Sequence, residues 1–87
     1  MMYLHSDLGS SNFERLRSIV MLRNGGRIVF AGNRRGKIYG SLHCKAGKRL
    51  KREHRVFFDS EAAAIEQGYR PCGHCLRSRY REWRLRQ

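Results

Sequence analysis

One short stretch of the chain, GYRPCGHC (Gly68–Cys75), holds two of the three cysteines and the only proline. Two residues separate Cys72 from Cys75, a spacing at which two thiolates can hold one metal ion in a tight turn. A CxxC pair alone is also typical of a redox dithiol. The third cysteine, Cys44, lies far upstream in a different local context. A distant cysteine together with a CxxC turn predicts one zinc ion that joins two parts of a small fold.

The length of 87 residues allows a single domain, residues 1–87, with room for a small core. Domains of this size gain little from hydrophobic burial alone, and a structural metal is a common source of further stability. The hydrophobic fraction of 40% is too high for a disordered chain. An odd number of cysteines without a signal peptide indicates a reducing compartment, so we expect a cytoplasmic protein. No apolar run approaches the length of a membrane-spanning helix, so we expect no membrane partner.

The charge balance indicates the class of partner. Lys and Arg number 19 against 7 Asp and Glu, which gives a formal net charge of +12. Such an excess favours polyanions as partners, nucleic acid first, and we expect DNA more than RNA. Arginine far outnumbers lysine, which suits bidentate contacts to phosphate. The alternative is a basic surface that only interacts with solvent.

The hydrophobic pattern predicts an α+β fold, with a small antiparallel three-stranded sheet and flanking helices, stabilised by one zinc site. Residues 1–10 form an N-terminal lead without clear periodicity. Ser11 and Glu14 form a capping box for a helix from Asn12 to Arg23, which we expect to cover one side of the sheet. A short helix follows the strands, capped by Asp59 or Ser60. The expected strands and short helix are, in order, 27–31, 37–42, 55–58 and 61–67.

A final amphipathic basic helix is expected over residues 76–86. Its apolar stripe has helical spacing and predicts docking on the sheet, with Trp83 as a core anchor; the stripe comprises Leu76, Tyr80 and Trp83. A neighbouring face carries arginines at the same spacing, which are either solvated or placed against DNA: Arg77, Arg81 and Arg84.

Two basic segments are the expected contacts to a phosphate backbone. The first is the turn between the first two predicted strands, whose glycines and asparagine are typical of a hairpin. The second is the basic loop that directly follows Cys44 and would be tethered to the metal at one end. Together the expected nucleic-acid contacts are Arg34, Arg35, Lys48, Arg49, Lys51, Arg52 and Arg55.

The order of a helix, a hairpin, a cysteine and a strand, followed by an alanine-rich helix and a CxxC, resembles a known family. It is similar to the Ada-type metal-binding domain, the N-terminal zinc module of the bacterial Ada methylphosphotriester DNA repair protein. The resemblance covers Arg27 to Cys75 and is most specific from Phe57 to Cys75, VFFDSEAAAIEQGYRPCGHC with its preceding Val56. The stretch Gly32–Gly40, with Trp83 in the tail, looks like a compact stand-alone branch of this family.

The resemblance implies a zinc ion held by four cysteines, the first of which takes a methyl group from a phosphotriester in DNA. Its second, third and fourth ligands fall on Cys44, Cys72 and Cys75. The methyl-accepting cysteine falls on Gly40, which has no side chain. The resemblance therefore implies a DNA repair or transcription-regulation context, and the glycine predicts that the family's methyl-acceptor activity is absent. We assign no catalytic residue.

Three thiolates leave a tetrahedral zinc one ligand short, and four histidines compete for the place. We prefer His5, because Gly40 opens a space through which the N-terminal segment could enter. His43 is the second choice, since neighbouring side chains rarely both reach one ion. A bound water or hydroxide is the third. His54 fits a phosphate contact better, and the His74 side chain should point away from the CxxC turn.

Two other functions remain open at this point. One of the remaining zinc-bound thiolates could itself accept alkyl groups from methylphosphotriester DNA, because zinc-bound cysteine is nucleophilic. The domain could also be a zinc-stabilised adaptor that binds RNA or an acidic protein through its charge.

Overall fold

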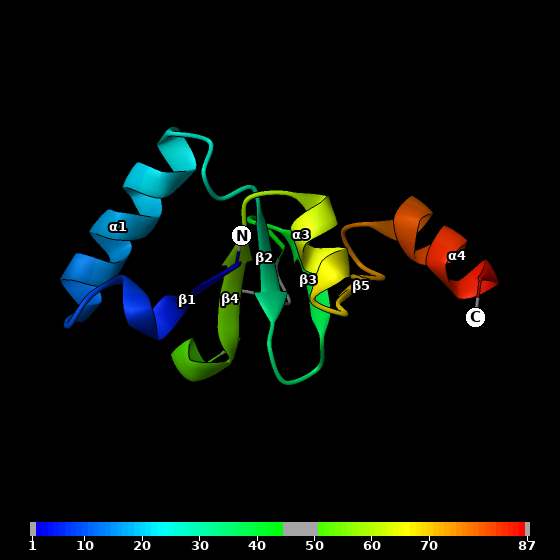
Figure 1. Ribbon diagram of the computed structural model, residues 1–87, viewed down its shortest axis with the longest axis horizontal. Coiled ribbons are helices and arrows are strands. Elements are labelled where there is room, and N and C mark those ends of the chain that lie inside the picture. The colour runs from blue at the N-terminus through cyan, green and yellow to red at the C-terminus, as the bar shows by residue number, and fades with distance from the viewer. Residues whose placement is uncertain (1, 45–50, 87) are drawn as a thin grey trace.

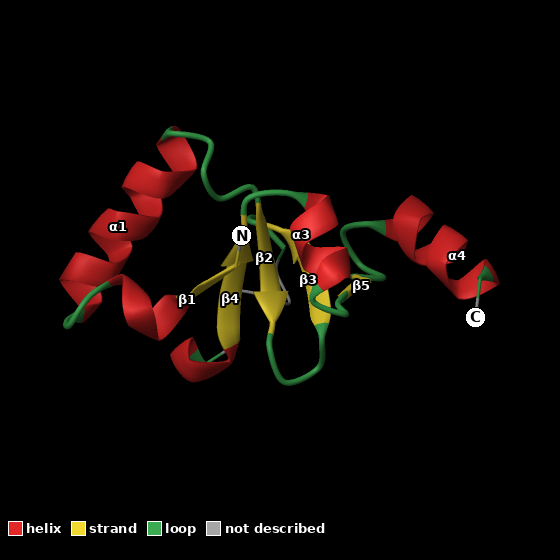
Figure 2. Ribbon diagram, in the orientation of Figure 1, coloured by secondary structure: helices red, strands yellow, loops and turns green. Residues whose placement is uncertain are grey.

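The computed structural model describes residues 2–44 and 51–86, which form a small mixed sheet with helices around it (Figure 1). The elements in chain order are β1 (Met2–Leu4), the 3₁₀ helix η1 (His5–Leu8), α1 (Asn12–Asn24), β2 (Phe30–Asn33), β3 (Ile38–Ser41), the 3₁₀ helix η2 (Arg52–His54), β4 (Arg55–Phe58), α3 (Glu61–Glu66), β5 (Arg70–Pro71) and α4 (Arg77–Leu85). Figure 2 shows the strands gathered at the centre, with α1 and α4 at opposite ends. The α+β class is confirmed. No helix in the described part of the chain is long and apolar enough to cross a membrane.

The prediction of a three-stranded antiparallel sheet is wrong, because the sheet has five strands in the order β1-β4-β2-β3-β5. The three predicted strands form its centre, and both extra strands lie at the edges. β1 comes from the N-terminal lead and pairs antiparallel with β4. β5 pairs parallel with β3, so the sheet is mixed. Strands of two and three residues carry no periodicity of their own, and only the neighbouring strand makes them extended.

The sheet buries one face under α3, which lies in front of the strands in Figure 1. Register places Val56, Phe58 and Tyr39 on this face, and all three are almost fully buried. α3 begins at Ser60, whose side chain accepts a hydrogen bond from the backbone N–H of Ala63. The small alanines of α3 let the helix approach closely, and the core there comprises Tyr39, Val56, Phe58, Ala63, Ala64 and Tyr69.

A buried hydroxyl connects this core to α4. The Tyr39 hydroxyl donates a hydrogen bond to Glu61 Oε2 at 2.8 Å, and the other carboxylate oxygen of Glu61 pairs with Arg79 of α4. Burial, together with the Glu61 carboxylate, raises the pKa of Tyr39 well above its ordinary value. The phenol therefore stays a donor at neutral pH, and the contact links β3, α3 and α4.

The expectation that the first helix covers the sheet is wrong. Its bounds agree with the prediction, and Ser11 caps it by accepting from the Glu14 N–H. However, no residue of α1 is buried, and the helix lies at the far end of the molecule (Figure 1). It is held to the preceding segment by hydrogen bonds from Ser18 to the Leu8 carbonyl and from Arg15 to the Gly9 carbonyl. Its apolar residues Phe13, Leu16 and Met21 are exposed.

The packing predicts that Phe58→Ala destabilises the domain far more than Phe13→Ala. Phe58 is fully buried and its ring packs edge-on against Tyr69, with ring centroids 4.9 Å apart. Removing a buried phenylalanine costs about 3–5 kcal/mol. Phe13 is 74% exposed, so its removal should change the free energy of unfolding by less than about 0.5 kcal/mol. Urea unfolding followed by circular dichroism measures both, and equal losses would contradict the described core.

Candidate metal centre

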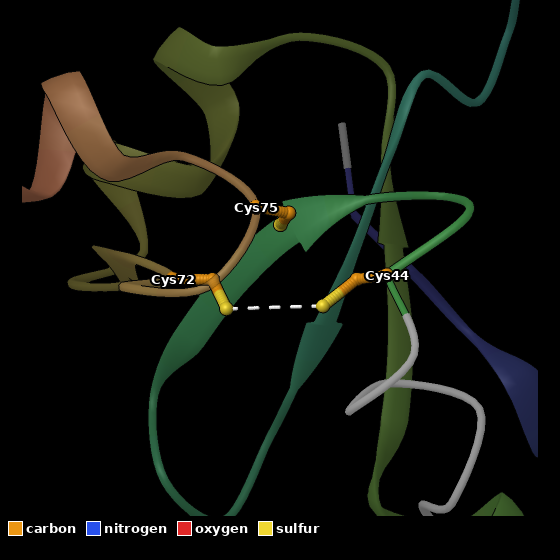
Figure 3. A group of neighbouring side chains, drawn as sticks. All are labelled: Cys44, Cys72 and Cys75. Atoms are coloured by element: carbon orange, nitrogen blue, oxygen red, sulfur yellow. Dashed lines mark hydrogen bonds between the residues drawn. The ribbon is translucent and has the colours of Figure 1, made fainter.

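Two segments, the turn after β3 and the CxxC turn after β5, bring the cysteines together. Cys44 closes the turn after β3, where its N–H donates to the Ser41 carbonyl at 3.2 Å. Cys72 directly follows β5, and its N–H donates to the Tyr39 carbonyl at 2.8 Å, which extends the pairing of β5 with β3. Cys75 lies in the turn that leads into α4. Figure 3 shows the sulfurs of Cys44 and Cys72 turned toward each other, with Cys75 beside them.

The spacing of the three sulfurs matches that of zinc ligands. All three Sγ atoms lie within 4.8 Å of one another, and the sulfurs of Cys44 and Cys72 are 3.8 Å apart. Two sulfurs bound to one tetrahedral zinc at about 2.3 Å are separated by about 3.8 Å. A disulfide would need about 2.05 Å, and none of the three cysteines forms one. The residues therefore fit a zinc ion, and the three cysteines form one zinc site.

Backbone N–H groups point at two of these sulfurs. The N–H of Ser41 donates to Cys75 Sγ at 3.3 Å, and the N–H of His74 donates to Cys72 Sγ at 3.4 Å. Such donors stabilise the negative charge of a thiolate ligand and orient it. His74 thus contributes its backbone to the site, and its side chain is exposed. This agrees with the expectation that its imidazole points away.

Without a metal, Cys75 remains a thiol at neutral pH because its pKa is raised. Burial raises the pKa of Cys75 to about 11; the Ser41 N–H opposes this shift, while Cys44 and Cys72 add to it. Zinc binds thiolates only, so its binding must displace these protons. The bound ion supplies the positive charge that lets three sulfurs remain deprotonated side by side.

Gly40 lies directly against the three cysteines. A Cβ atom built on Gly40 would be 2.7 Å from Cys75 Sγ, 3.2 Å from Cys72 Cβ and 3.9 Å from Cys44 Cβ. Cβ atoms essentially never approach another atom to 2.7 Å, so any side chain at this position would displace Cys75. The glycine therefore lets the CxxC turn approach β3 closely.

The structure does not bring His5 or His43 to the sulfurs. Within residues 2–44 and 51–86, the only His, Cys, Asp and Glu side chains that group as metal ligands are those of the three cysteines. His5 follows β1, and its ring lies edge-on against Phe57, 5.7 Å between centroids. β1 and β3 are separated by β4 and β2, a distance of about 14 Å at ordinary strand spacing. His43 precedes a ligand in sequence, but its side chain is exposed.

A groove opens beside the metal centre on the sheet face opposite α3. Its volume is about 180 Å³. Register places the floor residues on this opposite face, since Ala31 pairs with Gly40 and Asn33 pairs with Ile38. The lining residues are Ala31, Gly32, Asn33, Ile38, Tyr39, Gly40, Ser41, Cys44, Arg55, Arg70, Cys72, Gly73 and His74. The groove thus runs from the base of the β2–β3 hairpin to two of the three cysteines.

Arg70 is a residue of this site that the sequence analysis did not single out. Its guanidinium lies over the rings of Tyr80 and Trp83, 5.3 and 5.6 Å from their centroids. It also donates to the Pro71 carbonyl at 3.2 Å. The two aromatic rings stack on each other, so α4 holds the arginine at the edge of the groove. Trp83 is only partly buried and is a platform for this arginine, not the core anchor that we expected.

The structure describes the side chains of only some of the residues predicted to contact phosphate. Arg34 and Arg35 are exposed in the β2–β3 turn, and the Arg34 N–H donates to the His54 carbonyl at 2.7 Å. This bond puts the turn beside η2, close to exposed Lys51. Arg55 is partly buried and lines the groove. Lys48 and Arg49 lie outside the described residues, as does the side chain of Arg52.

A small α+β domain with three cysteines around one zinc position defines the class of this protein. The family model of the metal binding domain of Ada matches residues 24–77. The chain therefore belongs to that family, as the resemblance predicted. No curated protein and no solved structure matches the chain.

The three-cysteine cluster predicts how zinc content responds to substitution. Cys72→Ser should lower zinc below one ion per chain and reduce the melting temperature, because metal binding contributes directly to folding. His5→Ala and His43→Ala should keep the full zinc content, since neither side chain lies among the sulfurs. Native mass spectrometry and thermal unfolding measure both properties. Loss of zinc in His5→Ala with an unchanged fold would overturn this ligand set.

The raised pKa of Cys75 predicts a pH dependence for the metal-free protein. The folded thiol keeps its proton up to about pH 11, whereas the unfolded chain loses it near pH 9. The folded state therefore binds more protons between these values, and its stability falls as pH rises through them. Zinc-loaded protein already holds thiolates, so it should lack this loss.

The measurement is urea unfolding, with and without zinc, across this pH range in the presence of a phosphine reductant. Tyr39 and Tyr69 also have raised pKa values and contribute to both curves, so the difference between the two forms reports the cysteines. A metal-free form that becomes more stable with rising pH, relative to the loaded form, would contradict the prediction.

Proposed function

We propose that this zinc domain binds DNA mainly through backbone phosphates, in a DNA repair or transcription-regulation context, and does not accept methyl groups. The observation that supports the proposal best is the position of the basic residues around the groove. We name Arg34, Arg35, Arg55 and Arg70 the basic path: Arg55 of β4 and Arg70 of β5 line the groove that reaches Cys44 and Cys72, and Arg34 and Arg35 are exposed in the hairpin turn.

Strand pairing places the four arginines of the basic path at one end of the sheet. Arg34 and Arg35 lie at the hairpin turn, one end of β2 and β3. Asn33 at the base of the turn pairs in register with Arg55, and Ile38 across from Asn33 pairs with Arg70. The basic side chains thus come from β4, from β5 and from the turn between β2 and β3, all at the same end of the sheet. A phosphate backbone laid along this end would contact several of them at once.

The overall charge supports the same partner. A net charge of +12 on 87 residues favours a polyanion over a neutral ligand. The arginines of α4 add to this field, because Arg77, Arg81 and Arg84 are all exposed. Binding of this kind releases counterions from the DNA and is therefore strongly salt-dependent.

Two features support the absence of methyl-acceptor activity. Gly40 occupies the position of the family's acceptor cysteine and offers no nucleophile. Two of the remaining sulfurs accept backbone N–H bonds, from Ser41 and from His74, which lower the reactivity of a thiolate by stabilising it. The site is therefore better suited to holding a metal than to attacking an alkyl group.

The binding experiment compares two double variants with equal loss of charge. Arg34→Gln with Arg35→Gln removes two side chains of the path; Arg17→Gln with Arg23→Gln removes two exposed arginines of α1. Fluorescence anisotropy with a labelled duplex is measured over a range of salt concentrations. Each lost phosphate contact should reduce the slope of log K against log salt by about 0.9, so the first variant should lose up to about two units and the second none.

Three results would contradict this proposal. They are no salt-dependent binding by zinc-loaded wild type, equal slope losses in both variants, and complete displacement of the duplex by RNA at equal concentration. The last would favour RNA as the partner.

A separate measurement checks the chemistry. After incubation with duplex DNA that carries methylphosphotriesters, the mass of the intact protein should be unchanged, because no acceptor lies at Gly40. A protein whose Gly40 is replaced by cysteine is the matched comparison for the family's acceptor position. A gain of one methyl group on wild type, mapped to Cys44, Cys72 or Cys75, would show alkyl transfer instead.

A further inference from the structure

The zinc position lacks a fourth ligand from the described part of this chain. In residues 2–44 and 51–86, only Cys44, Cys72 and Cys75 contribute to the cluster. Residues 45–50 read Lys-Ala-Gly-Lys-Arg-Leu and contain no histidine, cysteine, aspartate or glutamate. Zinc is normally four-coordinate, and a site with three protein ligands completes its shell with an outside ligand.

β3 supplies no ligand to the cluster at Gly40, because a Cβ there would lie only 2.7 Å from Cys75 Sγ. With glycine at this position, no side chain enters from β3. The groove reaches the cluster here, since Gly40, Cys44 and Cys72 all line it. Its volume of about 180 Å³ is more than ten times the roughly 10–15 Å³ that one water needs, so a larger group can enter.

The charges around the groove favour an anion. One Zn²⁺ and three thiolates sum to −1, which by itself would repel an anionic ligand. Arg55 and Arg70 line the same groove, and their positive charge offsets this repulsion. No aspartate or glutamate is among the described residues that line the groove. The arginines therefore make a fourth, negatively charged ligand acceptable.

Arg70 is the better placed of the two for this role. Its position over the rings of Tyr80 and Trp83 restricts the guanidinium, and the bond from one terminal nitrogen to the Pro71 carbonyl uses only part of its five donors. Arg70 and Cys72 both line the groove, so a group that enters it can contact both residues. A planar guanidinium matches the oxygens of phosphate.

We propose that Gly40 and Arg70 form an entry site for one anionic oxygen ligand of the phosphate type, which occupies the fourth position of the zinc. The shared chemistry is a phosphate oxygen, from a DNA backbone phosphate or from free inorganic phosphate. This inference rests on the proposed function where the phosphate belongs to DNA. Binding is by coordination and hydrogen bonds, and no covalent bond of the phosphate breaks.

The test uses protein loaded with Co²⁺ in place of zinc, in a buffer free of chloride and phosphate. The visible absorption bands of Co²⁺ report the identity of its ligands directly. Adding inorganic phosphate to wild type should shift these bands saturably. Arg70→Gln should weaken the apparent affinity about tenfold, the loss expected for one charge-assisted contact. Arg17→Gln, an exposed arginine of α1, is the matched control and should leave the affinity unchanged.

A second arm replaces phosphate by duplex DNA and by a duplex with uncharged methylphosphonate linkages. The normal duplex should shift the Co²⁺ bands, and the uncharged duplex should not. A third arm uses Gly40→Cys, which should supply a fourth thiolate, intensify the sulfur-to-cobalt charge-transfer band and abolish the response to phosphate. If this variant fails to fold because its Cβ displaces Cys75, the comparison of Arg70→Gln with Arg17→Gln still decides the proposal.

The outcomes separate this inference from the proposed function. Salt-dependent DNA binding without any change in the Co²⁺ bands leaves DNA binding intact and overturns the entry site. A band shift with phosphate, but no binding to DNA, supports the entry site for free phosphate and overturns the proposed function. Equal affinities in Arg70→Gln and wild type, or bands that change in His43→Ala before any anion is added, overturn the entry site.

Discussion

The metal centre depends on the parallel pairing of β5 with β3. Two backbone bonds make this pairing, from the Arg70 N–H to the Lys37 carbonyl and from the Cys72 N–H to the Tyr39 carbonyl, both at 2.8 Å. They place the CxxC turn against the strand that leads to Cys44. Without them, three cysteines that are up to 31 residues apart in sequence would have no common position. Zinc bound there would join the turn after β3 to the CxxC turn, next to the two-residue edge strand β5. The strand pairing and metal binding therefore stabilise each other.

The two faces of the sheet divide the work of folding and binding. One face packs Val56, Phe58 and Tyr39 under the small alanines of α3 and forms the core. The opposite face has a groove of about 180 Å³ lined by Asn33, Arg55 and Arg70. In a domain of 87 residues a single small core gives limited stability, which explains the value of a metal at the open edge. The same metal then lies where an outside ligand can reach it.

Residue chemistry and spacing were enough to predict the ligand cysteines, α1, α3 and the three central strands, because each depends on local pattern or on side-chain type. The edge strands, His5 and Arg70 depend on tertiary arrangement. β1 and β5 are extended only because β4 and β3 offer free hydrogen-bonding edges. His5 was expected near the metal because sequence distance does not reveal sheet order, which puts three strand spacings between β1 and β3. Arg70 lies at the groove because its guanidinium packs over Tyr80 and Trp83. The helical spacing of these two aromatic residues on α4 does not reveal that they contact Arg70.

Gly40 removes the methyl-accepting cysteine that the family resemblance implies at this position, and it leaves the zinc without a ligand from β3. A cysteine at this position would be both a ligand and a nucleophile, and a methylated cysteine cannot be used again. With glycine the nucleophile is absent, and the place it would occupy faces the groove. A phosphate oxygen that enters there exchanges freely, because only coordination and hydrogen bonds hold it. On the proposed function, the same substitution therefore changes a reaction that consumes the protein into reversible recognition of the DNA backbone. Arg70 favours that change, since its charge reduces the repulsion between the anionic zinc–thiolate cluster and the phosphate that the cluster is proposed to bind.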